Sequence, residues 1–381
     1  MPTQGIKSIC FFGGFETGYP RSDVLRKGLE KRGVSVHMCR TSPRRRGIVR
    51  AVVLAFRYFT MRRPFRVIYV PEFRHKDVPL AYVVAKMTRK RLVFDPLVSR
   101  YDTKILDRGD AERGSVQAWH NRNLDRISMR LPDIVLADTR AHADYYESEF
   151  GVPANRTRVL PVGFDEDLFD YRNEELNRTG DDAAFIVLFF GNYLPLHGVD
   201  VIVSAAEILK EFGEIRFELI GRGQTFSAVE EYVRAHRLTN VRLLPRVPMD
   251  SLPAKIAAAD VCLGVFGRTE KAGRVVANKV YQAMAMGRPV VTADCPAVRE
   301  YFIDSQHICL VAPGDPVALA EKIRHLYENP HVRQQIGERA ARWVHERFTS
   351  EAVAGTFLGY CGELGHPWER PDGNGEVYRR G

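Results

Sequence analysis

Residues 275–294, VVANKVYQAMAMGRPVVTAD, read as a loop, a helix and a strand in direct succession. Gly287, followed by an Arg-Pro pair, is typical of a helix end, because glycine adopts the left-handed conformation and proline cannot continue the helix. Residues 290–292, VVT, then supply the β-branched side chains of a buried strand. Counting back from Gly287, Asn278 is predicted to cap the start of the helix. A short helix that leads directly into a buried strand indicates an α/β unit.

This helix begins with an unusual charge. Lys279 follows the expected cap and lies in the first turn, where the helix dipole disfavours a cation by about 0.3–1 kcal/mol. An anion would reverse that sign, since free N–H groups and the lysine would converge on it. Gln282 shares a face with Lys279, so a phosphate and a hydroxyl-rich group would fit side by side. The alternative is a solvated lysine next to a surface glutamine.

The same strand–helix alternation continues through the whole chain. In the second half, FIVLFFG (185–191) and IRFELIG (215–221) are apolar runs separated by a helical stretch. In the first half, IKSICFF (6–12), FRVIYV (65–70) and DIVLAD (133–138) are similar runs. Short apolar runs between helices predict buried parallel strands, and 381 residues exceed one ordinary core. We therefore expect an α/β protein with two doubly wound domains.

The boundaries follow from composition. We predict an N-terminal domain over residues 1–170, a polar linker over 171–184 and a C-terminal domain over 185–348. Residues 349–381 form a final helix and tail, and that helix is expected to pack back on the N-terminal domain. Ligands of such sheets bind outside the carboxyl ends of the strands, so the site should lie in a cleft between the two domains.

Composition excludes several classes of protein. Hydrophobic residues make up 45% of the chain and charged residues 27%, which is typical of a globular protein. The six cysteines form no CxxC pair, so we expect reduced cysteines, no metal site and a cytoplasmic protein. No apolar run approaches the ~18 residues of a membrane span, and the N-terminus lacks the apolar core of a signal peptide.

The net charge of +9 is concentrated in one stretch. Residues 31–71 contain no Asp or Glu, and arginine clusters there flank the apolar segment IVRAVVLAFRYFT (48–60). A helix packed on a sheet with basic ends is the interpretation we favour. Docking at the inner, anionic membrane face is the alternative. Nucleic acid is not an expected partner, because no recognisable nucleic-acid-binding module accompanies the charge.

Six segments carry a family resemblance when they are taken in order. They are FFGGFETGYPRSDVLRKGLEKRGVSVH (11–37), VLADTRAHADYYESEFGVPANRTRVLPVGFDEDLF (135–169), FFGNYLPLHGVDVIVSAAEIL (189–209), FELIGRGQ (217–224), VRLLPRVPMDSLPAKIAAADVCLGVF (241–266) and NKVYQAMAMGRPVVTAD (278–294). This ordered set resembles the retaining GT-B glycosyltransferases of the group 1 type (family 4). The resemblance covers roughly residues 5–348 and is strongest in the C-terminal half.

The resemblance implies GT-B architecture, in which two Rossmann-like doubly wound domains face a central cleft. It implies a nucleoside-diphosphate sugar of UDP or GDP type on the C-terminal domain, and transfer with retention to a sugar, lipid-linked or small-molecule acceptor on the N-terminal domain. No metal or further cofactor is expected. A sugar-nucleotide epimerase and a non-catalytic nucleotide-sugar-binding homologue are the alternatives. A Rossmann oxidoreductase fits poorly, because GGFETG (13–18) lacks the GxGxxG spacing.

Two departures from the family pattern concern the donor site. The family carries two glutamates eight positions apart, and here they fall on Arg274 and Gln282. Gln282 can still accept a hydrogen bond from a hydroxyl, and Glu270 is close enough in the loop to substitute for the first glutamate. His197 stands where relatives have a lysine or arginine near the pyrophosphate. If His197 contacts phosphate, donor affinity should rise as the pH falls through the histidine range.

The predicted site residues come from both halves of the chain. Gly14 follows the first strand and would let the backbone approach a ligand closely. The residues expected to bind the donor are Gly14, Asn192, His197, Arg222, Glu270, Lys271, Arg274, Asn278, Lys279 and Gln282. Those expected to bind the acceptor are His75, Asp95 and Asp102, and those expected to act in catalysis are Asp95, His197 and Arg274.

Overall fold

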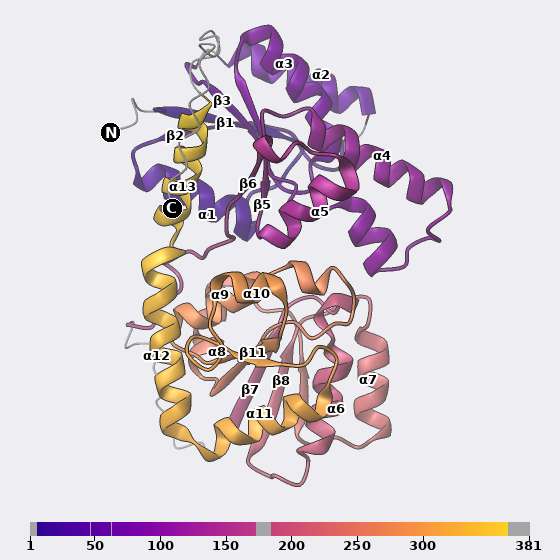
Figure 1. Cartoon of the computed structure of the whole chain (residues 1–381), viewed down its shortest axis with the longest axis vertical. Helices are drawn as coiled ribbons and strands as arrows, with labels where there is room; N and C mark the ends of the chain where they lie inside the picture. Colours follow the sequence, from indigo (N-terminus) through magenta and orange to yellow (C-terminus); the bar gives the residue numbers. More distant parts are fainter. Residues whose placement is uncertain (1–5, 46, 62, 173–183, 365–381) are drawn as a thin grey trace.

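The computed structural model describes residues 6–45, 47–61, 63–172 and 184–364. It contains two α/β domains stacked along the long axis of the molecule (Figure 1). Most of the predicted linker and the predicted tail, residues 173–183 and 365–381, lie outside the described residues.

The N-terminal domain is built on a six-stranded parallel sheet of order β2-β1-β3-β4-β5-β6. Its strands are β1 (Ser8–Gly13), β2 (Ser35–Arg40), β3 (Val67–Val70), β4 (Arg91–Phe94), β5 (Ile134–Ala137) and β6 (Thr157–Val159). Its main helices are α1 (Pro20–Lys31), α2 (Gly47–Thr60), α3 (Val78–Thr88), α4 (Val116–Arg130) and α5 (Arg140–Phe150). Short helical turns η1 (His75–Asp77), η2 (Asp102–Asp107) and η3 (Ala154–Arg156) follow β3, β4 and α5.

The C-terminal domain has a second six-stranded parallel sheet, of order β12-β11-β10-β7-β8-β9. Its strands are β7 (Phe185–Phe190), β8 (Ile215–Ile220), β9 (Val241–Leu244), β10 (Val261–Leu263), β11 (Val290–Ala293) and β12 (Cys309–Val311). Its helices are α6 (Val199–Ile208), α7 (Phe226–Ala235), α8 (Leu252–Ala257), α9 (Asn278–Ala285), α10 (Pro296–Tyr301) and α11 (Pro316–Glu328). Short turns η5 (Pro195–His197), η6 (Met249–Ser251) and η7 (Ala272–Arg274) lie in its loops. The expectation of two doubly wound domains is confirmed.

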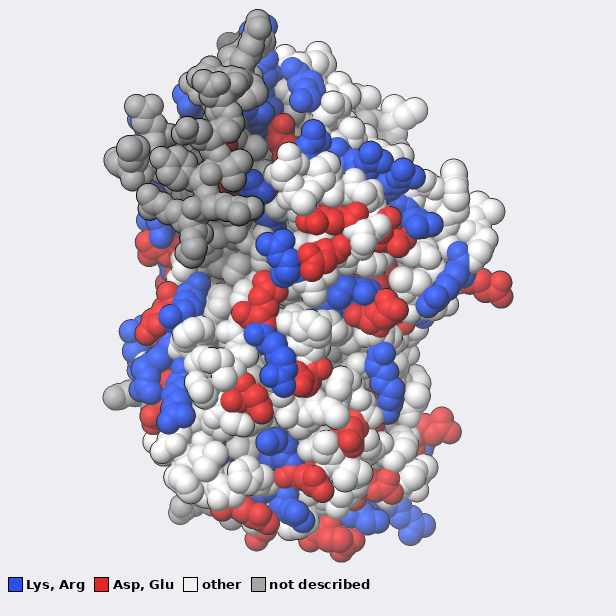
Figure 2. Space-filling view, in the orientation of Figure 1, with Lys and Arg blue, Asp and Glu red and all other residues white. Residues whose placement is uncertain are grey.

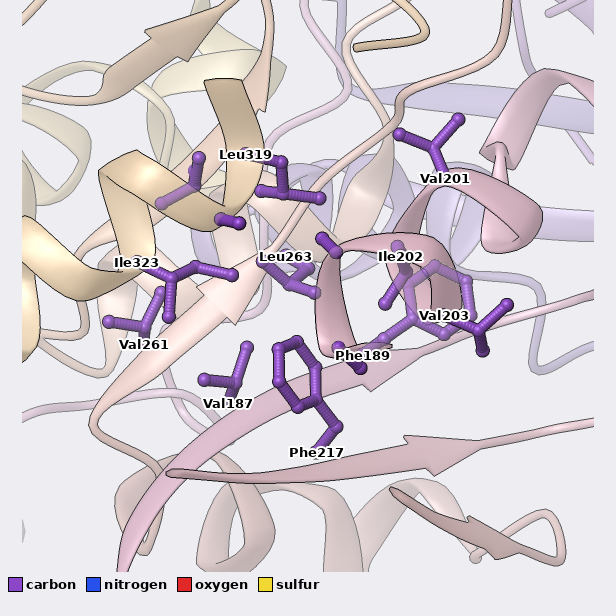
Figure 3. Close-up of a cluster of buried hydrophobic side chains, with 14 of the residues drawn as sticks. Val187, Phe189, Val201, Ile202, Val203, Phe217, Val261, Leu263, Leu319 and Ile323 are labelled. Atoms are coloured by element: carbon purple, nitrogen blue, oxygen red, sulfur yellow. The ribbon is translucent and has the colours of Figure 1, made fainter. Parts of the chain in front are cut away.

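Apolar strand residues form the core on both faces of each sheet, as expected for parallel strands covered by helices. In the C-terminal domain, Val187 and Phe189 of β7 pack with Ile202 of α6 and with Leu319 and Ile323 of α11 (Figure 3). All five side chains are fully shielded from solvent.

The last two helices connect the domains along one side of the molecule (Figure 1). Helix α12 (Pro330–Arg347) packs on α9, and α13 (Ser350–Glu363) packs on α1 of the N-terminal domain. The contact is close: a Cβ on Gly28 of α1 would lie 1.8 Å from the carbonyl oxygen of Ser350. Only glycine at position 28 therefore permits this packing.

Polar contacts across the cleft hold the two domains together at one edge. The Tyr301 hydroxyl donates to the carbonyl oxygen of Asp138 at 2.7 Å, and the Arg140 amide donates to Glu300 at 2.6 Å. The Thr139 hydroxyl donates to the carbonyl oxygen of Arg274 at 2.7 Å. These contacts place α10 and the loop before α9 directly against the start of α5.

Candidate active site

A cavity of about 600 Å³ lies between the carboxyl ends of the two sheets. Asp138 follows β5, and Asn192 follows β7, so both enter the cavity from strand ends. The strands β7 and β8 end very close together, because a Cβ on Gly221 would lie 1.8 Å from the carbonyl oxygen of Gly191. Helix α9 points its first turn into the same space through Asn278 and Lys279. The cavity therefore lies where doubly wound sheets bind ligands.

The start of α9 lacks a side-chain cap within the described part of the chain. The capping position is Ala277, and Asn278 is the first helical residue, so the prediction that Asn278 caps the helix was wrong. The reason is local: the backbone turns extended one residue earlier, at Ala277, whose methyl group cannot accept a hydrogen bond. The first N–H groups and the positive end of the dipole thus face the cavity without a competing side chain.

Lys279 is the most unusual residue of this cavity. Its side chain is only 6% exposed, and its Nζ has no hydrogen-bond partner among the described residues. The ammonium group lies 3.8 Å above the ring of Phe189, and a Cβ on Gly191 would approach it to 3.0 Å. Burial lowers the pKa of Lys279 well below its ordinary value. Burial disfavours the charged form of this amine, and an anion bound at the helix N-terminus would favour it. The start of α9 is therefore a candidate anion site.

Gln282 lines the cavity one turn along α9 and is also 6% exposed. The sequence placed it on the same helix face as Lys279, and both side chains reach the same cavity. The solvated lysine and surface glutamine that we kept as an alternative are excluded, because both residues are buried.

His197 lines the cavity next to Lys279, at the end of the loop after β7. Its Nδ1 donates to the carbonyl oxygen of Asn192. Burial, together with the nearby Lys279 ammonium, lowers the pKa of His197 well below 6.5. His197 is therefore neutral near pH 7, so its titration does not supply the expected gain of affinity in the ordinary histidine range.

Two other predicted donor residues in the loop before α9, Lys271 and Arg274, point to different places. Lys271 lines the cavity, and its Nζ donates to the Thr103 hydroxyl at 2.8 Å. Arg274 instead turns toward the N-terminal domain, where it pairs with Asp102 at 2.8 Å. The Arg274 guanidinium also lies 4.2 Å from the centre of the Tyr145 ring. Arg274 thus joins the domains and does not line the cavity.

Two further donor predictions also lie off the cavity wall. Glu270 is exposed and pairs with Arg274 at 3.3 Å. Arg222 stacks on the ring of Phe226 at 3.7 Å and is not among the residues that line the cavity. A different arginine, Arg246, lines the cavity and donates to Asn192 Oδ1 at 2.6 Å. Its place in the loop after β9 was the sequence signal that we missed.

The predicted residues of the N-terminal domain are mostly engaged inside that domain. Asp95 is fully buried and accepts hydrogen bonds from Arg21 Nε at 2.7 Å and from the Tyr69 hydroxyl at 2.9 Å. Gly14 donates its N–H to Asp77 at 2.8 Å. Neither residue lines the cavity. The Arg21 guanidinium and the Tyr69 hydroxyl both donate to Asp95 Oδ2, because a buried carboxylate needs a partner.

The remaining two acceptor predictions are buried as well. His75 is fully buried, and burial lowers its pKa to about 3, so it stays neutral in the native protein. Its Nε2 lies 3.5 Å from Asp125. Asp102 is the partner of Arg274 described above. The structure therefore places His75, Asp95 and Asp102 outside the cavity.

The N-terminal wall of the cavity is formed by residues that the sequence reasoning overlooked. Tyr19, Phe73 and Leu97 supply an apolar surface, and Asp138 is the one carboxylate among the described lining residues. Asp138 is hydrogen-bonded to the Nδ1 of His142 one turn along α5. It occupies the position directly after an apolar strand, the same signal that pointed to Asp95.

Two family models match this chain. The model described as "Glycosyl transferase 4-like domain" matches residues 11–163, and "Glycosyl transferases group 1" matches residues 184–329. The chain belongs to the group 1 glycosyltransferase family. The two matches coincide with the two α/β domains, and the cavity lies between them.

Individual members of the glycosyltransferase family show how far the likeness extends. An uncharacterized glycosyltransferase of Methanocaldococcus jannaschii is 27% identical over 48% of this chain and 49% of its own length. A D-inositol 3-phosphate glycosyltransferase of Xylanimonas cellulosilytica is 29% identical over 59% of this chain and 56% of its own length. The chain thus spans about half the length of these curated relatives.

A solved structure has a fold similar to that of this chain. Anabaena HepE, in complex with UDP and glucose, is 17% identical and superposes with a TM-score of 0.70. The match covers 94% of this chain and all of that one. The chain therefore has the two-domain, Rossmann-like GT-B fold.

Among the described residues, no group of three or more His, Cys, Asp or Glu side chains is arranged to hold a metal ion. Within the same residues, no helix has the length and apolar character to cross a bilayer.

Proposed function

We propose that this protein transfers a sugar from a nucleoside-diphosphate sugar, of UDP or GDP type, to an acceptor hydroxyl with retention at the anomeric carbon. The observation that carries the proposal is the buried, unpaired ammonium of Lys279 at the open N-terminus of α9. A diphosphate is the group that matches a cation and free backbone N–H groups converging on one point.

The donor would lie along α9. Its diphosphate would contact Lys279 and the first-turn N–H groups, and a ribose hydroxyl would donate to the amide oxygen of Gln282. As the bond from the anomeric carbon to the phosphate oxygen breaks, negative charge grows on the diphosphate. The fixed charge of Lys279 and the helix dipole stabilise that charge, which is the usual electrostatic route to catalysis.

The acceptor would enter from the N-terminal side, against Tyr19 and Phe73. Its hydroxyl oxygen would bond to the anomeric carbon on the face that the diphosphate leaves, and its proton would pass to the departing phosphate oxygen. The described cavity wall offers Asp138 as its one carboxylate, and a paired-carboxylate mechanism needs two. Retention without a protein nucleophile is therefore the mechanism that we propose, as the family resemblance implies.

The names of similar proteins support this proposal. Anabaena HepE was solved with UDP and glucose, and one sequence relative is named a D-inositol 3-phosphate glycosyltransferase. Whether the acceptor here is a soluble sugar or lipid-linked is part of the proposal to be tested. The cytoplasmic location and the independence from metal and cofactor stay predictions.

A nucleotide screen tests donor binding first. Melting temperatures are measured with UDP, GDP, other nucleoside diphosphates and the matching nucleosides. A ligand at ~100 times its dissociation constant should stabilise the fold by about 2.7 kcal/mol. If no nucleoside diphosphate raises the melting temperature, the proposed donor site is wrong.

Turnover then separates the three candidate activities. A transferase consumes the donor sugar only when an acceptor is present, and NMR of the product gives the anomeric configuration. An epimerase changes the free donor without an acceptor. Binding without turnover across an acceptor panel would indicate a non-catalytic homologue. Inversion in the product would overturn the retaining mechanism.

A further inference from the structure

Helix α2 carries an apolar face that nothing in the described protein covers. Five large apolar side chains on it are exposed: Ile48 82%, Val49 61%, Val52 60%, Phe56 69% and Phe59 54%. At 100° per residue these positions fall within an arc of about 100°. The sequence led us to favour a helix packed on the sheet with basic ends. The helix does pack on the domain core, but only through one face, and its apolar face is not buried as we expected.

The opposite face of α2 does the packing. Leu54 and Tyr58 are buried and belong to the core cluster of the N-terminal domain. The exposed face is therefore not required by the fold. A solvent-facing helix surface normally carries charged or polar residues, and here it carries isoleucine, valine and phenylalanine. A contiguous apolar surface of this kind marks an interaction site.

The neighbouring helix also exposes apolar side chains. Helix α3 contacts α2 and exposes Val83 and Met87, which are four residues apart on one face. Both helices lie at the top of the view in Figure 1, on the N-terminal domain. In the same region of Figure 2, the charged side chains in view are mainly Lys and Arg, lying among uncharged ones.

Cations stand at both ends of the apolar face. Arg44 and Arg45 precede α2, and Arg63 and Arg66 follow it; all four are exposed. Within the described residues, none of these four pairs with a carboxylate, whereas Arg50 pairs with Asp77 at 2.8 Å. The apolar face is thus bracketed by unpaired positive charge, in a stretch without acidic residues from 31 to 71.

A second cavity strengthens the electrostatic argument. It measures about 660 Å³ and lies against the segment that follows α2, with Lys7, Arg63, Arg66 and Lys90 in its wall. No carboxylate is among its described lining residues. The cavity has room for phosphate groups, and its four cations supply the matching charge just beyond the C-terminal end of α2.

We propose that α2 is an interfacial helix that docks the N-terminal domain on an anionic lipid bilayer. The apolar face would enter the boundary between headgroups and acyl chains, while the flanking arginines would contact acidic headgroups. A second copy of the chain is a poorer partner, because a symmetric pairing of this face would bring the same arginine clusters together. The bilayer supplies both properties that the surface requires, an apolar interior and a negative rim.

Vesicle sedimentation of the full chain tests the proposal. The vesicles contain either phosphatidylcholine alone or about one-third phosphatidylglycerol, at ~0.05 M and ~0.5 M salt. We expect binding to the anionic vesicles at low salt, with a loss of about tenfold or more at high salt and on neutral vesicles. Equal binding to both vesicle types, or none at low salt, would overturn the proposal.

Three variants separate the two components. Val52→Asp with Phe56→Asp should abolish vesicle binding, and Arg44→Glu with Arg45→Glu should weaken binding to anionic vesicles alone. Val317→Asp is the matched control, since Val317 is 53% exposed on α11 of the other domain. Circular dichroism melting confirms that each variant folds. A dimer without vesicles that the Val52/Phe56 variant dissociates would assign the face to a second copy and refute the membrane proposal.

Discussion

Lys279→Met is the substitution that tests the donor site most directly. Methionine keeps most of the side-chain volume and removes the amino group, which is buried and has no hydrogen-bond partner among the described residues. A buried polar group without a partner costs about 1–3 kcal/mol in mutational data. The variant should therefore be more stable than the parent by about that amount, with a higher melting temperature.

The same substitution should weaken donor binding. A hydrogen bond to a charged group contributes about 1.5–3 kcal/mol, which corresponds to about 10- to 100-fold in affinity. UDP should lose this factor, whereas uridine, which carries no phosphate, should keep its affinity within about twofold. Stability and diphosphate affinity thus change in opposite directions, which a general loss of packing cannot produce.

Isothermal titration calorimetry gives the two affinities, and thermal melting gives the stability. If GDP proves to be the better ligand, it replaces UDP, with guanosine in place of uridine. Lys210→Met is the matched control, because Lys210 is exposed and lies at the end of α6, away from the cavity wall. Equal losses for UDP and uridine would remove the phosphate role of Lys279. A less stable variant would refute the reading of its buried ammonium as an uncompensated charge.

Three further predictions follow from the same structure. Arg274→Gln breaks the pair with Asp102 and should lower the free energy of unfolding by about 3–5 kcal/mol, measured by thermal melting. It should change UDP affinity less than Lys279→Met does. A larger loss of UDP affinity would show that Arg274 binds the donor after all. The slope of UDP-glucose affinity against pH between about 6 and 8 should be the same in His197→Asn as in the parent, because burial holds the pKa of His197 well below 6.5; a slope abolished by the substitution would contradict this. Burial, and then the neighbouring Asp95 charge, raise the pKa of Glu72 from 4.5 to about 7, so the native state holds a proton that the unfolded chain releases. The free energy of unfolding should therefore decline by up to about 3 kcal/mol as the pH rises from 4.5 through 7. If the decline is unchanged in Glu72→Gln, this carboxyl is not its source.

The polar side chains after the strands show where sequence reasoning reached its limit. Asp95 and Asp138 both follow an apolar strand, and nothing in the local sequence distinguishes them. Arg21, from a helix more than seventy positions earlier, forms a buried ion pair with Asp95, which does not line the cavity. Asp138 remains on the cavity wall. Which carboxylate is available depends on a long-range partner that a local motif cannot reveal.

The fold and the donor helix were determined by local features of the sequence. Apolar runs separated by helices predicted both parallel sheets, because strand burial on two faces leaves that pattern in any such domain. The spacing of Lys279 and Gln282 predicted that they share one helix face, because α-helical periodicity is a local property.

Only the tertiary structure decided how charges and apolar surface are used. Arg274 does not line the predicted donor site, because it pairs with Asp102 and lies against the Tyr145 ring of the other domain. The apolar face of α2 remained exposed because the sheet has room for only one side of that helix, the side that carries Leu54 and Tyr58. Ion pairing and burial depend on which segments meet in space, and residues distant along the chain determine both.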